Sequence, residues 1–415
     1  MGPRRRGNDV FFILFISSSC LKNYSCVPPA SPLTRGLFRC LLIGMSLQLA
    51  LEFLQSNGRR VERIPVLEGF MGLSREAVIH FTGFDPLSAS SPGLTEIYRI
   101  LARKLEVDFY WGGGPPSDDA ETFDWQEGMS VATTRDGHRA AQWGIFKAGS
   151  QEDGRHFLHV PKPASLDEAL QFEPLKYFPE TVEEYVPRFQ AEHDKQQALA
   201  GDTGYAIPHH YTTAFHWALG VFGFELLCEA GLEEEDFHAL MERFAEISRR
   251  ITTAWSRVSG IKAFICHDDL TMTSGPIFPP DWYRRHVFPH YPGIFTPLKQ
   301  AGVPVVFTSD GDCSCFVDDI FAAGADGLNF EYLVSLRDLV ERHGDKMLIG
   351  NLSSSMIARG PVEKIEMEVR KCIDVGRHAP GFVVNVAGGL THDMLIAHLE
   401  AYLDTRKRLC REMCA

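Results

Sequence analysis

The sequence predicts an α/β protein, a (β/α)8 TIM barrel with a small β-rich insertion. From residue 181 to the C-terminus, short apolar runs alternate with amphipathic stretches of helical period. This alternation is typical of a parallel sheet with right-handed crossovers. About eight strands over roughly 350 residues favour a closed barrel over an open sheet. The 415 residues, 45% of them apolar, provide enough side chains for one barrel-sized core.

Charge and cysteine content exclude several classes of protein. The formal net charge of −13 argues against nucleic acid or an anionic membrane surface as the main partner, so we expect a small-molecule substrate. Ten cysteines are too few for a disulfide scaffold at this length, and none has zinc-finger spacing. Cys313 and Cys315 form a Cys-x-Cys pair that could bind metal or form a disulfide. Ordinary free thiols are expected, because no third ligand lies nearby.

Residues 1–44 differ from the rest of the chain. Three arginines precede the apolar run Val10–Ile16 and the small residues Ser17–Cys20, as in a signal peptide, and no acidic residue occurs between Val10 and Leu51. The run is too short to span a membrane. One interpretation is a leader for a plastid or another organelle, with no membrane contact in the mature form. The other is a gene-model extension before Met45 and a cytoplasmic protein.

The main domain is predicted to be residues 45–415, with an insertion at about 112–165. Before the insertion we expect a helix from Met45 to the break at Asn57-Gly58, an extended segment at Ile64–Val66, a helix at Leu94–Glu106 and a strand at Val107–Trp111. Within the insertion, a turn at Gly112–Pro116 precedes strands at Met129–Thr134, Ala140–Ala148 and Arg155–Val160. Asp136-Gly137 and Asp153-Gly154 separate these strands and predict hairpins.

After the insertion, helices and strands alternate. Helices are predicted at Thr181–Leu199, Thr213–Glu229, Glu233–Ser259, Pro280–Gly302, Asp318–Ala323, Leu333–His343, Pro361–Gly376 and His392–Cys410. Strands are predicted at Tyr205–Pro208, Ile261–Cys266, Val303–Gly311, Gly327–Phe330, Met347–Gly350 and Gly381–Val386.

The segment Val303–Gly311, with the sequence VPVVFTSDG, is the central strand of this pattern. Its apolar run ends abruptly in polar residues, which is typical of a buried parallel strand. The carboxyl ends of such strands carry the chemistry, so Ser309, Asp310 and Asp312 are expected where a ligand binds. An equally weighted alternative is that Asp310 and Asp312 cap the next helix.

Other polar residues also directly follow apolar runs and are expected at the same barrel mouth. They are His209, His210, Tyr211, His267, Asp268, Asp269, Glu331, Tyr332, Asn351 and Asn385. About half of this set is expected to be structural, for example Asp268 as a helix cap. Carboxylates gathered in one mouth repel each other, so one is expected to be protonated beside an ionised one, as an acid and base pair. Alternatively, they hold a divalent cation.

Six motifs resemble the uroporphyrinogen decarboxylase superfamily, which has a (β/α)8 fold and also contains cobalamin-dependent methyltransferases. They are RIPV at 63–66, the run from His267 to Gly302, FTSDGD at 307–312, GADGLNFE at 324–331, LIGNL at 348–352 and GFVVNVAGG at 381–389. The sequence departs from the characteristic motifs of both the methyltransferases and the decarboxylases. Thr308 and Asp310 stand where the methyltransferases have a zinc-binding His-x-Cys pair, and Leu67–Gly72 replaces the arginine-rich motif of the decarboxylases.

The resemblance implies a lyase, a decarboxylase that needs no cofactor and acts on a tetrapyrrole, as in porphyrin biosynthesis, or on a related carboxylate. Asp310 would be the acid, with Asp268 and Asp269 as its partners. The substrate-binding residues would be Tyr211, His267, Ser309, Gly311, Asp312, Glu331 and Asn385. The alternative is a corrinoid-linked methyltransferase that binds a divalent metal through Asp310, His267 and Cys313. A barrel without catalytic activity is a third class, and a homodimer is possible.

Overall fold

The computed structural model describes residues 46–58, 61–68, 71–118, 131–133, 139–143, 146–150, 160 and 162–412. The predictions for residues 1–44, for the turn at Asp153-Gly154 and for nearly all of the strand at Arg155–Val160 therefore lie outside the described residues.

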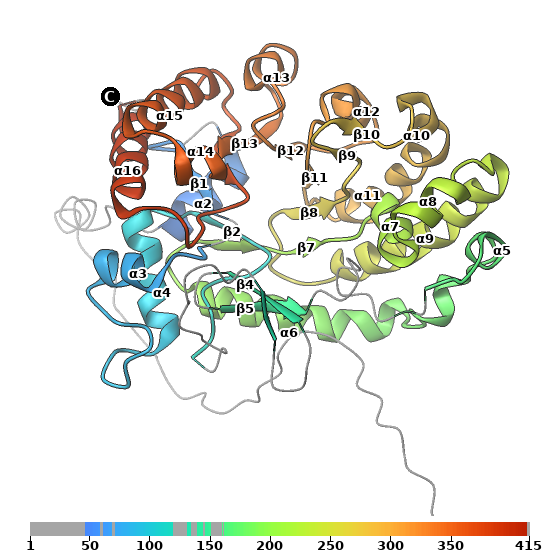
Figure 1. Ribbon diagram of the computed structural model, residues 1–415, viewed down its shortest axis with the longest axis horizontal. Helices are drawn as coiled ribbons and strands as arrows, with labels where there is room; N and C mark the ends of the chain where they lie inside the picture. The colour runs from blue at the N-terminus through green and yellow to red at the C-terminus, as the bar shows by residue number, and fades with distance from the viewer. Residues whose placement is uncertain are drawn as a thin grey trace, which may run out of the picture.

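A parallel sheet of nine strands forms the centre of the molecule, in the order β6-β2-β1-β14-β13-β12-β11-β8-β7 (Figure 1). The strands are β1 (Val66–Glu68), β2 (Phe109–Trp111), β6 (Tyr205–Ile207), β7 (His209–His210), β8 (Phe264–His267), β11 (Val305–Ser309), β12 (Gly327–Phe330), β13 (Met347–Ser353) and β14 (Phe382–Ala387).

The two ends of this sheet are halves of one strand. Pro208 separates β6 from β7; β6 pairs with β2, and β7 pairs with β8. Proline has no N–H to donate, but the Pro208 carbonyl accepts a hydrogen bond from the Ile265 N–H at 3.0 Å, so the ladder continues. The sheet therefore closes with eight strand positions, and the predicted (β/α)8 barrel is confirmed.

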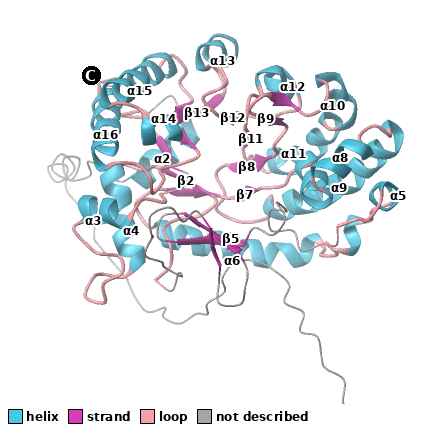
Figure 2. Cartoon of the chain, in the orientation of Figure 1, coloured by secondary structure: helices cyan, strands magenta, loops and turns pink. Residues whose placement is uncertain are grey.

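Helices surround the strands (Figure 2). They are α2 (Ser46–Ser56), α3 (Arg75–Thr82), α4 (Leu94–Leu105), α5 (Leu166–Leu170), η1 (Pro174–Lys176), α6 (Val182–Ala200), α7 (Phe215–Phe222), α8 (Phe224–Ala230), α9 (Glu234–Trp255), α10 (Pro280–His286), η2 (Phe288–His290), α11 (Tyr291–Gln300), η3 (Ser314–Phe316), α12 (Val317–Ala322), α13 (Leu336–His343), α14 (Ser354–Arg359), α15 (Val362–Gly376) and α16 (Ile396–Arg411).

Several predicted elements have different boundaries. The helix predicted at Thr213–Glu229 is two helices, α7 and α8, because Gly223 between them has a φ of +74°. The helix predicted at Pro280–Gly302 is divided into α10, η2 and α11, since prolines 289 and 292 lack the N–H that a continuous helix uses. The last helix begins at Ile396, and not at His392. Helices α3, α5 and α14 were not predicted.

The strands described within the predicted insertion form a separate antiparallel sheet. Its strands are β3 (Val131–Thr133), β4 (Arg139–Trp143) and β5 (Phe146–Ser150). The pairing of β3 with β4 lies across the predicted Asp136-Gly137 hairpin. The strand predicted at Ala140–Ala148 is wrong, because β4 and β5 are two strands that pair with each other.

The barrel interior is filled by side chains from alternate strand positions. A layer of apolar residues that includes Leu67, Ile207, Ile265, Val306 and Ile349 packs there as one cluster. The same cluster contains Phe53 of α2, so this helix closes the end of the barrel opposite the carboxyl ends of the strands. Polar residues at those carboxyl ends are therefore confined to one mouth.

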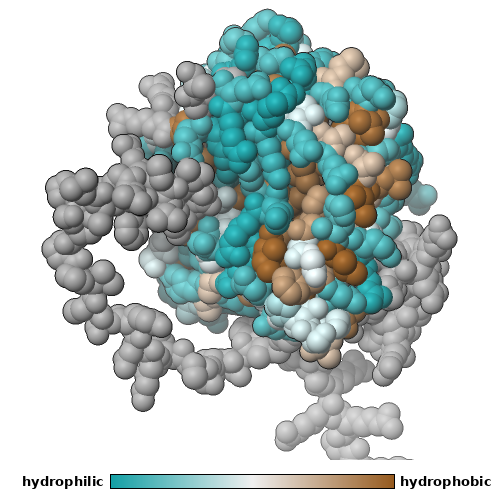
Figure 3. Space-filling view, turned by 90° about the vertical axis from the view of Figure 1, so that its left-hand side faces the viewer, coloured by the Kyte–Doolittle hydropathy of each residue, from teal (hydrophilic) through white to brown (hydrophobic). Residues whose placement is uncertain are grey.

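The outer surface that carries α15 and α16 is largely hydrophilic. Figure 3 shows this side, with hydrophobic side chains gathered in its middle and lower parts. No helix among the described residues has the length and apolar content needed to cross a membrane.

A buried ion pair joins the first two strands. The Arg63 guanidinium donates two hydrogen bonds of 2.7 Å to the Asp108 carboxylate, which also accepts from the Val66 N–H at 2.9 Å. Arg63 and Asp108 are 8% and 0% exposed, so each charge depends on the other for its stabilisation.

Replacing Arg63 by Met should lower the free energy of unfolding by about 3 to 5 kcal/mol, because Asp108 is left buried without its cation. Urea unfolding followed by circular dichroism measures this. The control is Arg408→Met, which breaks an exposed pair with Glu412 and should cost about 0.5 kcal/mol or less. Equal effects of the two substitutions would contradict the role given to the buried pair.

Candidate active site

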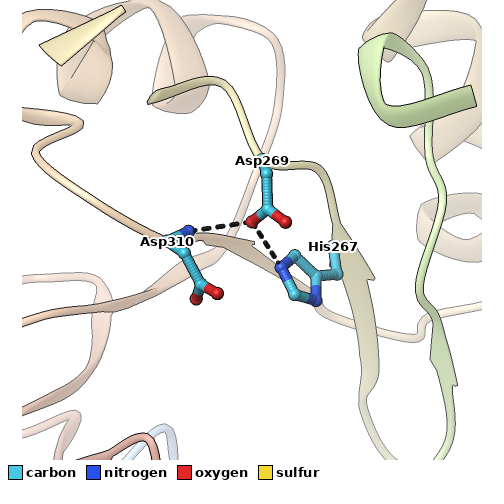
Figure 4. Close-up of side chains that lie close together, drawn as sticks. All are labelled: His267, Asp269 and Asp310. Atoms are coloured by element: carbon cyan, nitrogen blue, oxygen red, sulfur yellow. Dashed lines mark hydrogen bonds and ion pairs between the residues drawn. The ribbon is translucent and has the colours of Figure 1, made fainter. Parts of the chain in front are cut away.

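The core of the site is an ion pair at the end of β8. Asp269 Oδ1 lies 2.7 Å from His267 Nε2, and the same oxygen accepts a hydrogen bond from the Asp310 backbone N–H at 3.1 Å (Figure 4). The second carboxylate oxygen, Oδ2, lies 3.5 Å from Nδ1 of the buried His216 of α7. Asp269 is thus held between two imidazoles and one backbone N–H.

These contacts favour the charged forms of both partners. Burial opposes ionisation of Asp269, but the hydrogen bond and charge of His267, with the charge of His216, hold its pKa well below its usual range. Burial likewise opposes the charge on His267, yet Asp269 outweighs it and raises the pKa of His267. The contacts of the pair therefore favour an imidazolium beside a carboxylate.

Asp310 differs from Asp269, because its pKa is raised and not lowered. It follows β11, and its side chain is exposed in the mouth. Desolvation, with the charges of Asp269 and Glu331, raises the pKa of Asp310 to about 6, while His267 acts in the other direction. Two neighbouring carboxylates whose pKa values are driven apart form an acid and base arrangement. Asp310 is the member that can carry a proton near neutral pH.

The backbone after Asp310 is fixed by several contacts. Gly311 has a φ of +76°, and a Cβ atom there would lie 2.5 Å from the Met272 carbonyl oxygen. The Gly311 N–H donates to Glu331 Oε2 at 3.1 Å, and the Thr271 hydroxyl donates to the Asp310 carbonyl at 2.8 Å. Ser309 Oγ accepts from the Leu270 N–H at 3.1 Å. These bonds set the direction of the Asp310 side chain.

Aromatic rings line the other side of the ion pair. The ring centroids of Tyr211 and Trp111 lie 4.3 and 5.4 Å from that of His267. Both aromatic residues are partly buried. His209 is neutral near pH 7, because burial and the charge of His267 lower its pKa to about 4. The site therefore combines an acidic side with an aromatic side.

Asp268 points away from this mouth. Its carboxylate accepts hydrogen bonds from the backbone N–H groups of Ala214, Phe215 and His216 at 2.8, 2.8 and 2.6 Å, and from the Tyr291 hydroxyl at 2.7 Å. It is fully buried. All four donors are fixed, so this geometry favours the helix-capping alternative over direct participation in chemistry.

The structure separates the other predicted residues into two groups. His267, Asp269, Asp310, Gly311, Glu331, Ser309 and Tyr211 come together, as described above. Asp312 instead accepts hydrogen bonds from the Ser314 N–H and hydroxyl at 3.1 and 2.5 Å, which is a local cap. The Asn385 side-chain amide donates to Asn329 Oδ1 at 3.0 Å, within a neighbouring part of the barrel. His210 lies 2.8 Å from Ser248 Oγ, behind the mouth.

The sequence did not identify four residues at or near this mouth as candidates. They are Trp111, His216, Thr308 and Asn329. Asn329 and Thr308 are buried polar residues at register-paired positions of β12 and β11. A polar residue within a buried strand is a usable sequence signal. His216 reaches the site only through the packing of α7, which no local pattern reveals.

One group of side chains could hold a cation. Ligand atoms of His267, Asp269 and Asp310 all lie within 4.8 Å of one another. One imidazole and two carboxylates fit a divalent ion such as Mn²⁺, Fe²⁺ or Zn²⁺ better than a thiolate zinc site. The metal-ligand set predicted with Cys313 stays a prediction; among the described residues, the group whose ligand atoms come together contains Asp269 with His267 and Asp310. Cys313 is a buried free thiol.

A closed barrel with convergent acidic, imidazole and aromatic groups at the carboxyl ends of its strands defines the site as enzyme-like. Residues 223–409 match the family described as Uroporphyrinogen decarboxylase (URO-D). The resemblance predicted from the sequence motifs is thereby confirmed over this part of the chain.

Curated relatives with the name uroporphyrinogen decarboxylase match a limited part of the sequence. The protein of Geotalea uraniireducens is 26% identical over 38% of this chain and 44% of its own length. The protein of Geobacillus kaustophilus is 26% identical over 46% of this chain and 50% of its own length. The protein of Salinispora tropica is 31% identical over 37% of this chain and 40% of its own length. The matched part thus spans half or less of the length of each relative.

A solved structure of similar fold covers nearly the whole chain. A methyltransferase from Methanosarcina mazei aligns with 87% of this chain and 97% of its own, with a TM-score of 0.53 and 15% identity. At this identity the similarity supports the fold alone.

The rigid backbone at Gly311 can be tested against a matched glycine. Gly302 has nearly the same φ, +75°, but no atom lies within 4 Å of a Cβ built there. Gly302→Ala should cost about 1 to 2 kcal/mol, from the left-handed conformation alone. Gly311→Ala should cost clearly more in the same urea unfolding experiment, because the Met272 carbonyl must also move. Equal losses would show that the turn is not held against Met272.

Proposed function

We propose that the protein is a carboxy-lyase that removes CO2 from an organic carboxylate, with Asp310 as the proton donor. The observation that carries this proposal is the position of the exposed Asp310 carboxyl beside the partly buried Asp269–His267 ion pair. The match to the uroporphyrinogen decarboxylase family supports the reaction class.

The reaction is balanced without an oxidant or reductant. The bond between the substrate carbon and its carboxylate breaks, CO2 leaves, and the electron pair remains in the substrate. The Asp310 carboxyl gives its proton to that carbon, and the resulting carboxylate recovers a proton from water. The substrate must contain its own electron sink, such as a β-keto group, an iminium, or a pyrrole that is protonated at a ring carbon. The imidazolium of His267 compensates the negative charge.

The charges of the site favour a substrate with few carboxylates. The groups that perturb Asp310 are Asp269, Glu331 and His267, so carboxylates outnumber cations there. A substrate with eight carboxylates would meet repulsion from this mouth. The rings of Tyr211 and Trp111 favour a planar, unsaturated substrate on the opposite side. We therefore propose a planar substrate with one or two carboxylates.

A second candidate is metal-assisted methyl transfer. It is favoured by the ligand atoms of His267, Asp269 and Asp310, which lie within 4.8 Å of one another. A divalent cation held there would supply Lewis-acid chemistry at the mouth. Asp310 would then be a ligand and not a proton donor, so the two candidates make opposite predictions for chelation.

Asp310→Asn should reduce CO2 release by about 100-fold or more, because the amide cannot donate the catalytic proton. The measurement is CO2 release from uroporphyrinogen and from pyrrole and β-keto monocarboxylates. Asp312→Asn, two residues further, is the matched control and should keep activity within about threefold of wild type.

Chelation separates the two candidates in the same assay. Decarboxylation by Asp310 should persist after EDTA treatment and dialysis. Full CO2 release by Asp310→Asn would contradict the proposal. Loss of activity on chelation, with recovery on addition of Mn²⁺ or Zn²⁺, would favour the metal-dependent candidate.

A further inference from the structure

The segment that follows β8 is hydrogen-bonded along its length to the segment at the end of β11. Residues Asp269–Met272 form the first segment, and Ser309–Asp312 form the second. Each residue of the first segment makes a hydrogen bond to the second; the bonded pairs are Asp269 with Asp310, Leu270 with Ser309, Thr271 with Asp310 and Met272 with Asp312, at 3.1, 3.1, 2.8 and 3.3 Å. The two segments are therefore held together at four successive positions.

Both backbone polar groups of Asp310 take part in this contact. Its N–H donates to the Asp269 carboxylate at 3.1 Å, and its carbonyl accepts from the Thr271 hydroxyl at 2.8 Å. The carbonyl also accepts a longer bond, of 3.2 Å, from the Ser309 hydroxyl. Because the backbone of Asp310 carries the acid side chain, these bonds fix the direction in which its carboxyl points.

Thr271 belongs to a small hairpin that holds its side chain toward this turn. The hairpin consists of β9 (Thr271–Met272) and β10 (Gly275–Pro276), which pair antiparallel. Successive side chains of a strand point to opposite faces, and here Thr271 is 7% exposed whereas Met272 is 51% exposed. Water has little access to the buried hydroxyl, so the Asp310 carbonyl would not readily exchange this bond for one to water.

We propose that Thr271 is a positioning residue for the proton donor Asp310. It acts through the Asp310 carbonyl and not by contact with the reacting carbon. Proton transfer needs a donor at hydrogen-bond distance from the reacting atom, and a displacement of about 1 Å can lower a rate by about 100-fold. The effect on catalysis rests on the proposed decarboxylation, whereas the hydrogen bond to Asp310 does not.

Two substitutions of Thr271 separate the hydroxyl from the rest of the side chain. Thr271→Val keeps the branched shape without the hydroxyl, and Thr271→Ser keeps the hydroxyl. In the CO2-release assay, Thr271→Val should lower kcat about tenfold or more and leave KM within about twofold, because the substrate still binds but the acid is misplaced. Thr271→Ser should keep kcat within about threefold of the wild-type value.

Hydrogen exchange of the Asp310 backbone N–H gives a readout that does not depend on activity. This N–H is bonded to Asp269, so a turn that is held less firmly opens more often and exchanges faster. Thr271→Val should raise the exchange rate, measured by NMR on the full chain, by about tenfold, while Thr271→Ser should stay near the wild-type rate. Thermal unfolding midpoints verify that both variants fold.

The matched control is Thr273→Val, which removes an exposed hydroxyl from the same hairpin and should change neither kcat nor the exchange rate. Unchanged kcat and exchange in Thr271→Val would overturn the proposal. Equal losses in Thr271→Val and Thr271→Ser would also overturn it, since the hydroxyl would then not be the cause. If the wild type releases no CO2 from any tested substrate, the proposed decarboxylation fails, and the exchange rate still decides whether Thr271 holds Asp310.

Discussion

The hydrogen bonds of one buried carboxylate, Asp268, fix the geometry of the barrel mouth. It is bound at once by the first turn of α7 and by Tyr291 of α11. Since Asp268 stands between His267 and Asp269 in the chain, anchoring it also fixes these two neighbours. The same bonds hold the start of α7, from which His216 approaches Asp269. A structural carboxylate thus positions the functional one beside it.

The division of roles among the aspartates follows from their surroundings. Asp269 meets two imidazoles and a backbone N–H, and it is ionised. Asp310 meets mainly other carboxylates, and its pKa is raised. The turn at Gly311 adjoins Asp310, whose backbone N–H donates to Asp269. The barrel supplies this arrangement because parallel strands end at one mouth, above an apolar layer that keeps water out of the interior.

The alternation of strands and helices predicted the barrel because it depends on local periodicity, which is present in the sequence. The strand-end residues Asp310, Asp269 and His267 were predicted for the same reason. The division of one predicted helix at Gly223 was not, since the sequence around it is apolar on both sides. The sequence predicted the helix-capping role of Asp268 only as an alternative, because its hydrogen-bond donors come from α7 and α11. His216 was missed because only tertiary packing brings it to Asp269.

The most direct test of this account is the titration of the Asp310 carboxyl carbon, followed by ¹³C NMR and assigned by comparison with Asp310→Asn. The account predicts a midpoint near 6 for Asp310, while Asp269 remains ionised to much lower pH. A midpoint near 4 for Asp310 would contradict the account, because the residue would then hold no proton to donate near neutral pH. Uptake of the proton by Asp269 instead would contradict it as well.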